Sequence, residues 1–228
     1  MPRPRVNLLS VDLIADAAIE LADSGDTFGV NALARKLGVT PSSLYNHVDG
    51  KDAIIELMRS RLGARYFPEP ITGEWDEIVT GTVRGLRHLY ADHPLIVPLI
   101  VGKTITDPGV IGSYDRLATA LVDAGVPDDE VLAIVAVVDA YAIGFGLDLA
   151  SPDEIWQPTV PTVTLGRLIT DAAHGAERSD TAFEIGLEML VASRRCVCGC
   201  RTAADPQLVA STPRCARKSS QSARERSA

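Results

Sequence analysis

Residues 30–51 read VNALARKLGVTPSSLYNHVDGK, and this stretch decides the fold of the N-terminal part of the chain. Leu33 and Leu37 recur at helical spacing, and Gly38 supplies the positive φ with which many helices end. Thr40 can cap a second helix, and the proline after it suits the first helical position. The stretch therefore predicts two short helices around a tight turn, which is the helix-turn-helix arrangement of many DNA-binding proteins.

The second helix of this pair should have an inner and an outer side. Leu44 and Val48 are expected to point into a small core, and Ala34 on the first helix leaves room for two helices that cross at close range. The residues that should project outward are Ser42, Ser43, Tyr45, Asn46 and His47. A helix of this size fits the major groove of DNA, with its N-terminal residues nearest the base edges.

These residues resemble the DNA-binding domain of the tetracycline-repressor (TetR) family of bacterial transcription regulators. The resemblance rests on Leu-Gly-Val, the Thr-Pro cap, the run Leu-Tyr-Asn-His-Val with Lys51 three residues later, and Asp-Gly-Lys-Asp before an aliphatic helix. It covers residues 8–66. The fold and function that it implies are those of a helix-turn-helix domain that reads double-stranded DNA.

The resemblance also implies a role for each exposed residue. Those expected to face bases are Pro41, Ser42, Asn46 and His47, with Asn31 reaching from the preceding helix. Those expected to bind phosphates are Ser43, Tyr45 and Lys51. Thr40 would divide its hydroxyl between capping the helix and touching the DNA backbone. Simpler roles remain open, since Tyr45 could be a half-buried core aromatic, His47 a solvated surface residue, and Lys51 a solubilising charge.

The distribution of charge fits a DNA-binding N-terminal part despite a net charge of −8 over 228 residues. Residues 1–66 hold eight Lys/Arg and eight Asp/Glu, residues 67–193 hold six and twenty, and residues 194–228 hold eight and two. The acid is concentrated in the middle segment, so the N-terminal part is locally neutral. Its Arg3, Arg5, Arg35, Lys36 and Lys51 are available to meet phosphates.

The chain is expected to be cytoplasmic and without a membrane partner. It begins Met-Pro-Arg-Pro-Arg, and no apolar run follows that would form a secretory signal. The longest apolar stretch, residues 131–147, is shorter than the roughly 20 residues of a membrane helix and contains Asp139. It is predicted to be a buried helix.

The rest of the chain is predicted to be helical too, which gives an all-α fold. Ser10 can cap a first helix that ends near Gly25, and a fourth helix should cover 52–66. Prolines at 68 and 70 and a glycine at 73 mark the boundary between a three-helix helix-turn-helix DNA-binding domain and a larger helical ligand-binding and dimerisation domain. The predicted domains are 1–66, 67–195 and a basic, Cys-containing, disordered tail at 196–228. In the larger domain, helices are expected up to His93, up to about Gly102, and over 107–125, 127–147, 162–173 and 180–194, with a loop at 151–161 that carries Trp156.

Two of these helices predict a symmetric homodimer. The helix through 131–147 is apolar on all sides, so one face can enter its own core and the other can enter a second subunit. In the last helix Phe183, Leu187, Leu190 and Val191 form a stripe, and Gly186 would let another helix approach closely. The two helices and their copies should form a four-helix bundle. Such a dimer places two reading helices about 34–36 Å apart, so the operator should be a near-palindrome.

The middle segment, over 70–195, resembles the ligand-binding domain of the tetracycline repressors. The resemblance rests on Glu74-Trp75, His93, the Gly102 region, and the runs AYAIG at 140–144 and FEIGLE at 183–188. It implies an effector pocket and repression relieved by a small-molecule effector. Tetracycline repressors hold a magnesium chelate of the drug with two histidines, and Phe67 and Ile100 fall at about those places. Neither side chain can bind Mg²⁺, so tetracycline, a metal or another cofactor is not expected.

The effector is instead expected to be largely hydrophobic or aromatic and to be fixed by a few polar groups. The candidate lining residues are Phe67, Thr82, Leu86, Ile100, Thr104, Tyr114, Leu117, Val135 and Asp139. Each could equally be ordinary core. Asp139 is the sharpest candidate because it is an acid inside an apolar helix; it could orient a ligand, or form a hydrogen bond across the dimer or within the core. The helix at 52–66 is the expected lever between effector and DNA.

Other functional classes have weaker support. Cys196, Cys198, Cys200 and Cys215 could bind a soft metal or sense redox state, but they lie in a Ser-, Arg- and Pro-rich tail. The chain contains no phosphate-binding loop, nucleophile elbow or His-Glu-x-x-His motif, so no enzyme is predicted. A helical adaptor that binds no DNA remains the other alternative.

Overall fold

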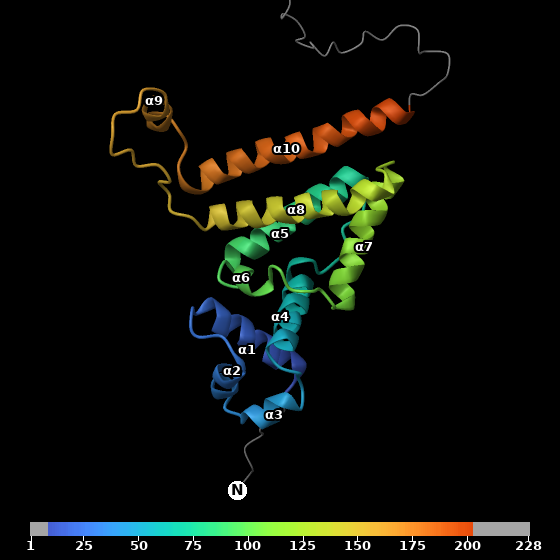
Figure 1. Ribbon diagram of the computed structural model, residues 1–228, viewed down its shortest axis with the longest axis vertical. Helices are drawn as coiled ribbons and strands as arrows, with labels where there is room; N and C mark the ends of the chain where they lie inside the picture. The colour runs from blue at the N-terminus through green and yellow to red at the C-terminus, as the bar shows by residue number, and fades with distance from the viewer. Residues whose placement is uncertain (1–8, 203–228) are drawn as a thin grey trace, which may run out of the picture.

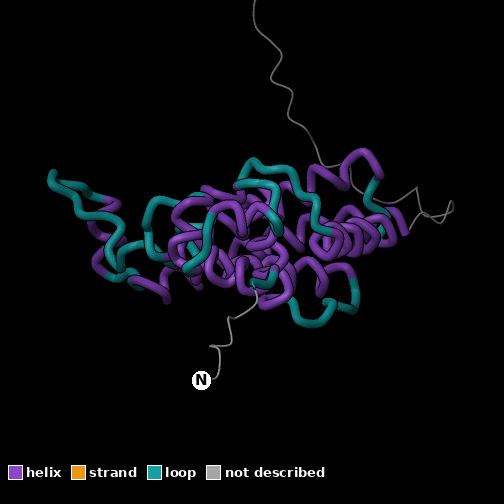
Figure 2. Tube along the Cα trace, turned by 90° about the horizontal axis from the view of Figure 1, so that it is seen from below, coloured by secondary structure: helices purple, strands orange, loops and turns teal. Residues whose placement is uncertain are grey.

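The computed structural model describes residues 9–202, with side chains described as far as Ala192. Within that range every regular element is a helix (Figure 2), which confirms the predicted all-α fold. The N-terminal helices lie at one end of an elongated molecule, and the remaining helices are stacked above them (Figure 1).

The N-terminal helices are α1 (Val11–Asp23), α2 (Val30–Leu37), α3 (Pro41–Tyr45) and α4 (Lys51–Tyr66). The predicted caps are confirmed, since the hydroxyl of Ser10 accepts a hydrogen bond from the amide of Leu13 (3.2 Å) and Gly38 adopts φ 68° at the end of α2. At the start of α3, the Thr40 hydroxyl accepts from the amide of Ser43 (3.2 Å).

The reading helix α3 is shorter than the sequence predicts. It ends at Tyr45, where the amides of His47 and Val48 both bond to the carbonyl oxygen of Leu44 (2.9 and 3.1 Å) and tighten the last turn. Val48 therefore lies in the turn after the helix rather than on it. Leu44 and Val48 are nevertheless buried as predicted, together with Leu33.

The second group of helices is arranged around α8 (Asp128–Leu149). Its other members are α5 (Trp75–Asp92), α6 (Val97–Ile100), α7 (Pro108–Asp123), α9 (Thr164–Thr170) and α10 (Gly175–Thr202). α8 packs on α5, α7 and α10 (Figure 1). Gly146 lets α8 approach α5 closely, because a Cβ there would meet Tyr90 and the backbone of α5. The segment around α9 extends away from the helical body in both views (Figures 1 and 2).

The last two helices differ from their predicted bounds. α9 is shorter than 162–173, whereas α10 begins at Gly175 rather than at 180 and continues to Thr202 rather than ending at 194. The prediction of disorder from 196 therefore disagrees with the helix as far as Thr202, and its remainder lies outside the described residues. The metal or redox role of Cys196, Cys198, Cys200 and Cys215 also concerns side chains outside the description, so it stays a prediction.

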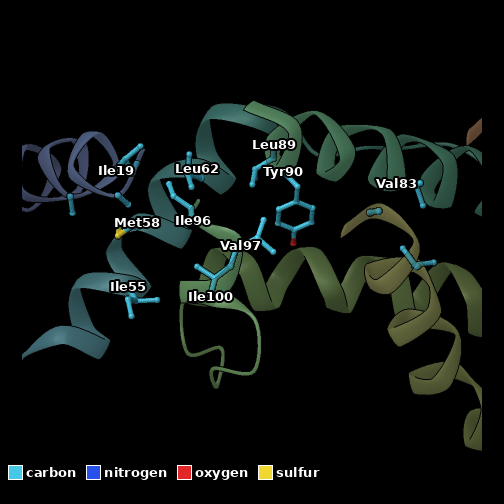
Figure 3. Close-up of a cluster of buried hydrophobic side chains, with 14 of the residues drawn as sticks. Ile19, Ile55, Met58, Leu62, Val83, Leu89, Tyr90, Ile96, Val97 and Ile100 are labelled. Atoms are coloured by element: carbon cyan, nitrogen blue, oxygen red, sulfur yellow. The ribbon is translucent and has the colours of Figure 1, made fainter. Parts of the chain in front are cut away.

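One buried cluster joins the two groups of helices. It runs from Ile19 of α1 through Met58 and Leu62 of α4 to the residues around α6 and to Leu89 and Tyr90 of α5 (Figure 3). α4 therefore contributes to the core on both sides of the predicted domain boundary.

α8 is long and apolar, and only part of its surface is covered within one chain. It is the one helix in the described part of the chain that could cross a membrane by length and composition alone, and a core helix passes the same test. Val131, Ile134, Val138 and Ala142 are buried. Leu132, Val137 and Leu147 remain exposed, with Ala133, Ala136, Ala140 and Gly144 between them.

Candidate functional sites on α3 and inside the helical body

The residues predicted to read DNA lie on the outer surface of α2 and α3, at the end of the molecule (Figure 1). Leu44 anchors α3 to the core, because its side chain is fully buried. The residues that are exposed around it are Asn31, Thr40, Pro41, Ser42, Tyr45, Asn46, His47 and Lys51, and Ser43 is half-buried. Tyr45 is 54% exposed and does not belong to the buried cluster or to the side chains packed against it, which argues against the alternative of a core aromatic. The DNA-binding role of each residue stays a prediction.

Two predicted phosphate contacts are held in place by neighbours. The hydroxyls of Thr40 and Ser43 share a hydrogen bond (3.0 Å), so the cap and the candidate phosphate ligand are linked. The ammonium of Lys51 lies 5.5 Å from the centre of the Phe28 ring, an attractive cation–π arrangement. Lys51 is thus positioned beside α3 at the start of α4.

A cavity of about 590 Å³ lies inside the helical body, between α4, α5, α7 and α8. Seven of the residues that were predicted to line it do so: Phe67, Thr82, Leu86, Ile100, Tyr114, Leu117 and Asp139. The lining positions of Thr104 and Val135 were predicted wrongly. Thr104 is exposed on the segment before α7, and Val135 is half-buried against the core on another side of α8. Whether the seven bind an effector is not tested by their position alone.

Sequence reasoning missed several lining residues that a helical repeat could have found. Tyr90 follows Leu86 by one turn of α5, and Ile143 follows Asp139 by one turn of α8. Arg59 could not be found in this way, because no residues of its helix, α4, were predicted to lie in the cavity wall. It lines the cavity together with Ser60, Leu62, Gly63 and Ala64 of the same helix.

Asp139 is the polar centre of the cavity. The hydroxyl of Tyr114 donates to its Oδ2 (2.9 Å), so a hydrogen bond within the core, one of the predicted alternatives, is confirmed. Its Oδ1 is buried and has no hydrogen-bond partner among the described residues. Burial raises the pKa of Asp139 against the opposing effect of the Tyr114 hydrogen bond. Burial and the charge of Asp139 raise the pKa of Tyr114 and bring the pKa of Tyr90 to about 12.

α4 is tied to the cavity wall by a set of hydrogen bonds. The carboxylate of Glu56 accepts from the backbone amides of Thr106 (2.9 Å) and Asp107 (3.2 Å) and from the guanidinium of Arg59. Arg59 in turn donates to the carbonyl oxygens of Ile100 (2.9 Å) and Thr104 (3.3 Å). These bonds join the last helix of the N-terminal group to the segment between α6 and α7, which lines the cavity.

The cavity does not have the donor set of a metal centre. Within residues 9–202, no group of three or more His, Cys, Asp or Glu side chains is arranged to hold a metal ion. Phe67 and Ile100, which replace the expected histidines, both line the cavity, and a phenyl and an aliphatic side chain offer no ligand to Mg²⁺.

Comparison with known proteins identifies the family. Residues 67–193 match the family described as tetracyclin repressor-like, C-terminal domain. The chain is 25% identical to the HTH-type transcriptional repressor DrrR1 of Streptomyces coeruleorubidus, over 85% of this chain and 82% of that protein. It is 27% identical to the HTH-type transcriptional repressor Rv1353c of Mycobacterium tuberculosis, over 83% and 81%.

Solved structures share the fold. Apo ActR of Streptomyces coelicolor superimposes with a TM-score of 0.68 at 22% identity, over 85% of this chain and 98% of that one. ActR in complex with actinorhodin gives a TM-score of 0.65 at 22% identity, over 82% and 96%. The family match covers more than half of the chain, and its relatives are regulators rather than enzymes. The chain belongs to the tetracycline-repressor (TetR) family of helix-turn-helix transcriptional regulators.

Proposed function

We propose that this chain is a repressor that binds a near-palindromic operator as a homodimer and is released by a small, largely hydrophobic effector. The observation that carries the proposal is the double role of α4, which packs on α1 at the DNA end and forms a wall of the cavity. A ligand in the cavity would touch the helix on which the DNA-reading helices rest. Effector binding and operator binding would then compete for the position of one element.

On the DNA side, the exposed residues of α3 support a major-groove contact. Asn46 can pair with an adenine, and His47 can donate to a guanine, whereas Tyr45 can bond a phosphate. We propose the division between reading and sensing domains at 66/67, and the basic Cys-containing tail as a separate segment that follows α10. The cytoplasm is the compartment in which such a regulator would meet its operator.

On the dimer side, the uncovered face of α8 supports a second subunit as the occupant. Leu132 and Val137 of α8 are 76% and 54% exposed, and Ile185 and Met189 of α10 are 52% and 68% exposed. These side chains continue the apolar surface from α8 onto α10, while the stripe with Phe183 packs inside its own chain. Two such surfaces related by a twofold axis would form a four-helix bundle.

On the effector side, the apolar lining supports a hydrophobic ligand, and two structural neighbours have been solved with a small molecule bound. ActR has been solved with actinorhodin. A TetR variant of Acinetobacter baumannii, with a TM-score of 0.62 at 19% identity, has been solved with minocycline. The effector of this chain would differ from a magnesium chelate, because neither Phe67 nor Ile100 can bind the ion.

The test begins by selecting bound fragments from random double-stranded DNA with the purified full chain. We expect recovery of a near-palindrome whose binding weakens steeply with salt. Tyr45→Ala should then lower affinity for operator and random DNA alike, whereas Asn46→Ala should mainly relax preference at one base position. His88→Ala, an exposed change on α5, is the control. A protein that selects no sequence, as an adaptor would, contradicts the proposal.

A further inference from the structure

The cavity contains an acid whose hydrogen-bonding capacity is largely unused. A carboxylate has about four lone-pair positions that can accept hydrogen bonds. At Asp139, the hydroxyl of Tyr114 occupies one of them at 2.9 Å, and Oδ1 has no partner among the described residues. Burying a polar group without a partner costs free energy, so an unpaired oxygen of this kind requires an explanation.

No side chain in the cavity wall supplies the missing donor. Three cationic residues line the cavity, and the hydrogen bonds that the structure shows direct each of them elsewhere. Arg59 bonds Glu56 and two backbone carbonyls, Lys103 pairs with Asp52 (2.9 Å), and Arg116 donates to Ser113 (2.9 Å).

Besides Asp139, two tyrosines supply polar groups at this end of the cavity. Tyr114 has a single proton to donate and gives it to Oδ2, while the raised pKa of its phenol keeps that proton in place at neutral pH. Tyr90 also lines the cavity, and its side chain projects away from α5 with the hydroxyl at the far end (Figure 3). The rest of the nearby wall is aliphatic or aromatic, and it includes Leu86, Leu117 and Ile143.

We propose that Oδ1 of Asp139 is the acceptor for a hydrogen-bond donor on the effector, so that the cavity selects an apolar, ring-containing molecule with a hydroxyl or protonated amine near one end. Tyr114 is the positioning residue, since its bond to Oδ2 orients the carboxyl group and leaves Oδ1 without a partner among the described residues. The inference rests on the proposed effector function of the cavity, and it narrows the class of effector.

Three probes with one aromatic body and different substituents test the requirement for a donor. These are 9-methylanthracene, which has no donor, 9-anthracenemethanol, a neutral donor, and 9-(aminomethyl)anthracene, a cationic donor. Binding to the full chain is followed by anthracene fluorescence. We expect at least one donor probe to bind about tenfold or more tightly than 9-methylanthracene. Equal binding of all three, or binding of none, overturns the inference.

Variants of the full chain assign the preference to one oxygen. Asp139→Ala should abolish the advantage of the donor probe and leave 9-methylanthracene binding unchanged or stronger. Asp139→Asn, which keeps an acceptor oxygen but removes the charge, should retain the preference for the alcohol and lose that for the amine. Tyr114→Phe should reduce the preference without removing the cavity. Asp115→Ala, which removes an exposed carboxylate of α7 outside the cavity lining, is the matched control and should retain the preference. A preference that survives Asp139→Ala contradicts the inference.

The same probes separate this inference from the proposed function. If a donor probe binds through Asp139 but leaves operator affinity unchanged, the inferred class of ligand is supported and the proposed release of the operator by an effector is contradicted. If 9-methylanthracene binds as tightly as the donor probes and releases the operator, the proposed release is supported and the role of Asp139 is contradicted.

Discussion

At the residue scale, a buried leucine and a half-buried aspartate illustrate opposite effects of burial. Leu44 is an apolar anchor whose burial fixes α3 on the core of the N-terminal helices. Asp139 is a polar group placed in apolar surroundings, where its unpartnered oxygen is expected to weaken the fold and is proposed to serve ligand recognition. The first is expected to be needed for stability, and the second for ligand choice.

Leu44→Ala should lower the free energy of unfolding by about 2–5 kcal/mol, because it leaves a cavity in a fully buried position. Urea denaturation followed by circular dichroism measures this change. Val122→Ala, at an exposed position of α7, is the control and should have little effect. Equal stability of Leu44→Ala and the wild type would show that α3 is not anchored through this side chain.

Asp139→Asn should raise the melting temperature relative to the wild type, and the difference should grow with pH. The folded-state pKa of Asp139 is raised above the ordinary 3.8, so its contribution is fully present below that value and is lost as pH rises through the folded-state pKa. The titratable groups that face Asp139 are Tyr114 of α7 and Tyr90 of α5, and the charge of Arg59 on α4 acts on both tyrosines. Melting curves between about pH 4 and pH 8 provide the measurement. A difference that stays constant across this pH range would contradict the assignment.

At the scale of elements, α4 connects the reading helices to the cavity. It contacts two different partners, since α1 packs along it and the segment before α7 is bonded to Glu56 and Arg59. The carboxylate of Glu56 accepts hydrogen bonds from backbone amides of the segment before α7. A shift of that segment would therefore change these bonds whatever its side chains do. This arrangement makes the Glu56 contacts the expected route by which the cavity influences DNA binding.

Glu56→Ala should reduce the coupling between effector and operator while leaving both bindings measurable. Couplings of this kind are typically about 1–3 kcal/mol, and the variant should lose a large part of whatever the wild type shows. The measurement is the affinity of the strongest-binding anthracene probe with and without operator DNA. Asp115→Ala, which removes an exposed carboxylate of α7 outside the cavity lining, is the control. Coupling that persists in Glu56→Ala would exclude this route.

Many of the helix boundaries could be predicted from the sequence, because capping and helix-breaking residues act locally. Ser10, Gly38, Thr40 and Asp107 mark helix ends that the structure confirms. The length of α3 was predicted wrongly, because the sequence up to Val48 is compatible with helix and only the local turn bonds to the Leu44 carbonyl end it. The start of α10 was also predicted wrongly, since the helix begins at Gly175. The cavity residues on α4 were missed because contacts between distant segments leave no periodic signal.

At the scale of the whole molecule, the exposed apolar side chains of α8 and α10 support the proposed dimer. A contiguous apolar surface of this kind marks an interaction site in a soluble protein. Twofold pairing would cover it and would set the separation of the two α3 helices, which no single chain can do.

Val137→Arg should convert the dimer to a monomer, because it places a charge in the centre of the α8 face. Val122→Arg is a matched control, since the two valines are 54% and 45% exposed and Val122 lies on α7. Sedimentation velocity measures the mass, and operator binding should fall with loss of the dimer. A wild-type chain that sediments as a monomer would refute the assembly.

The continuous core described above has one further effect, on how the protein opens. Because the buried cluster passes from α1 through α4 to α5 without interruption, the reading helices cannot melt independently of the sensing helices. A bound probe should therefore slow deuterium uptake at the amides of α1, far from any atom that it touches. Protection confined to the cavity walls would indicate two separately unfolding units.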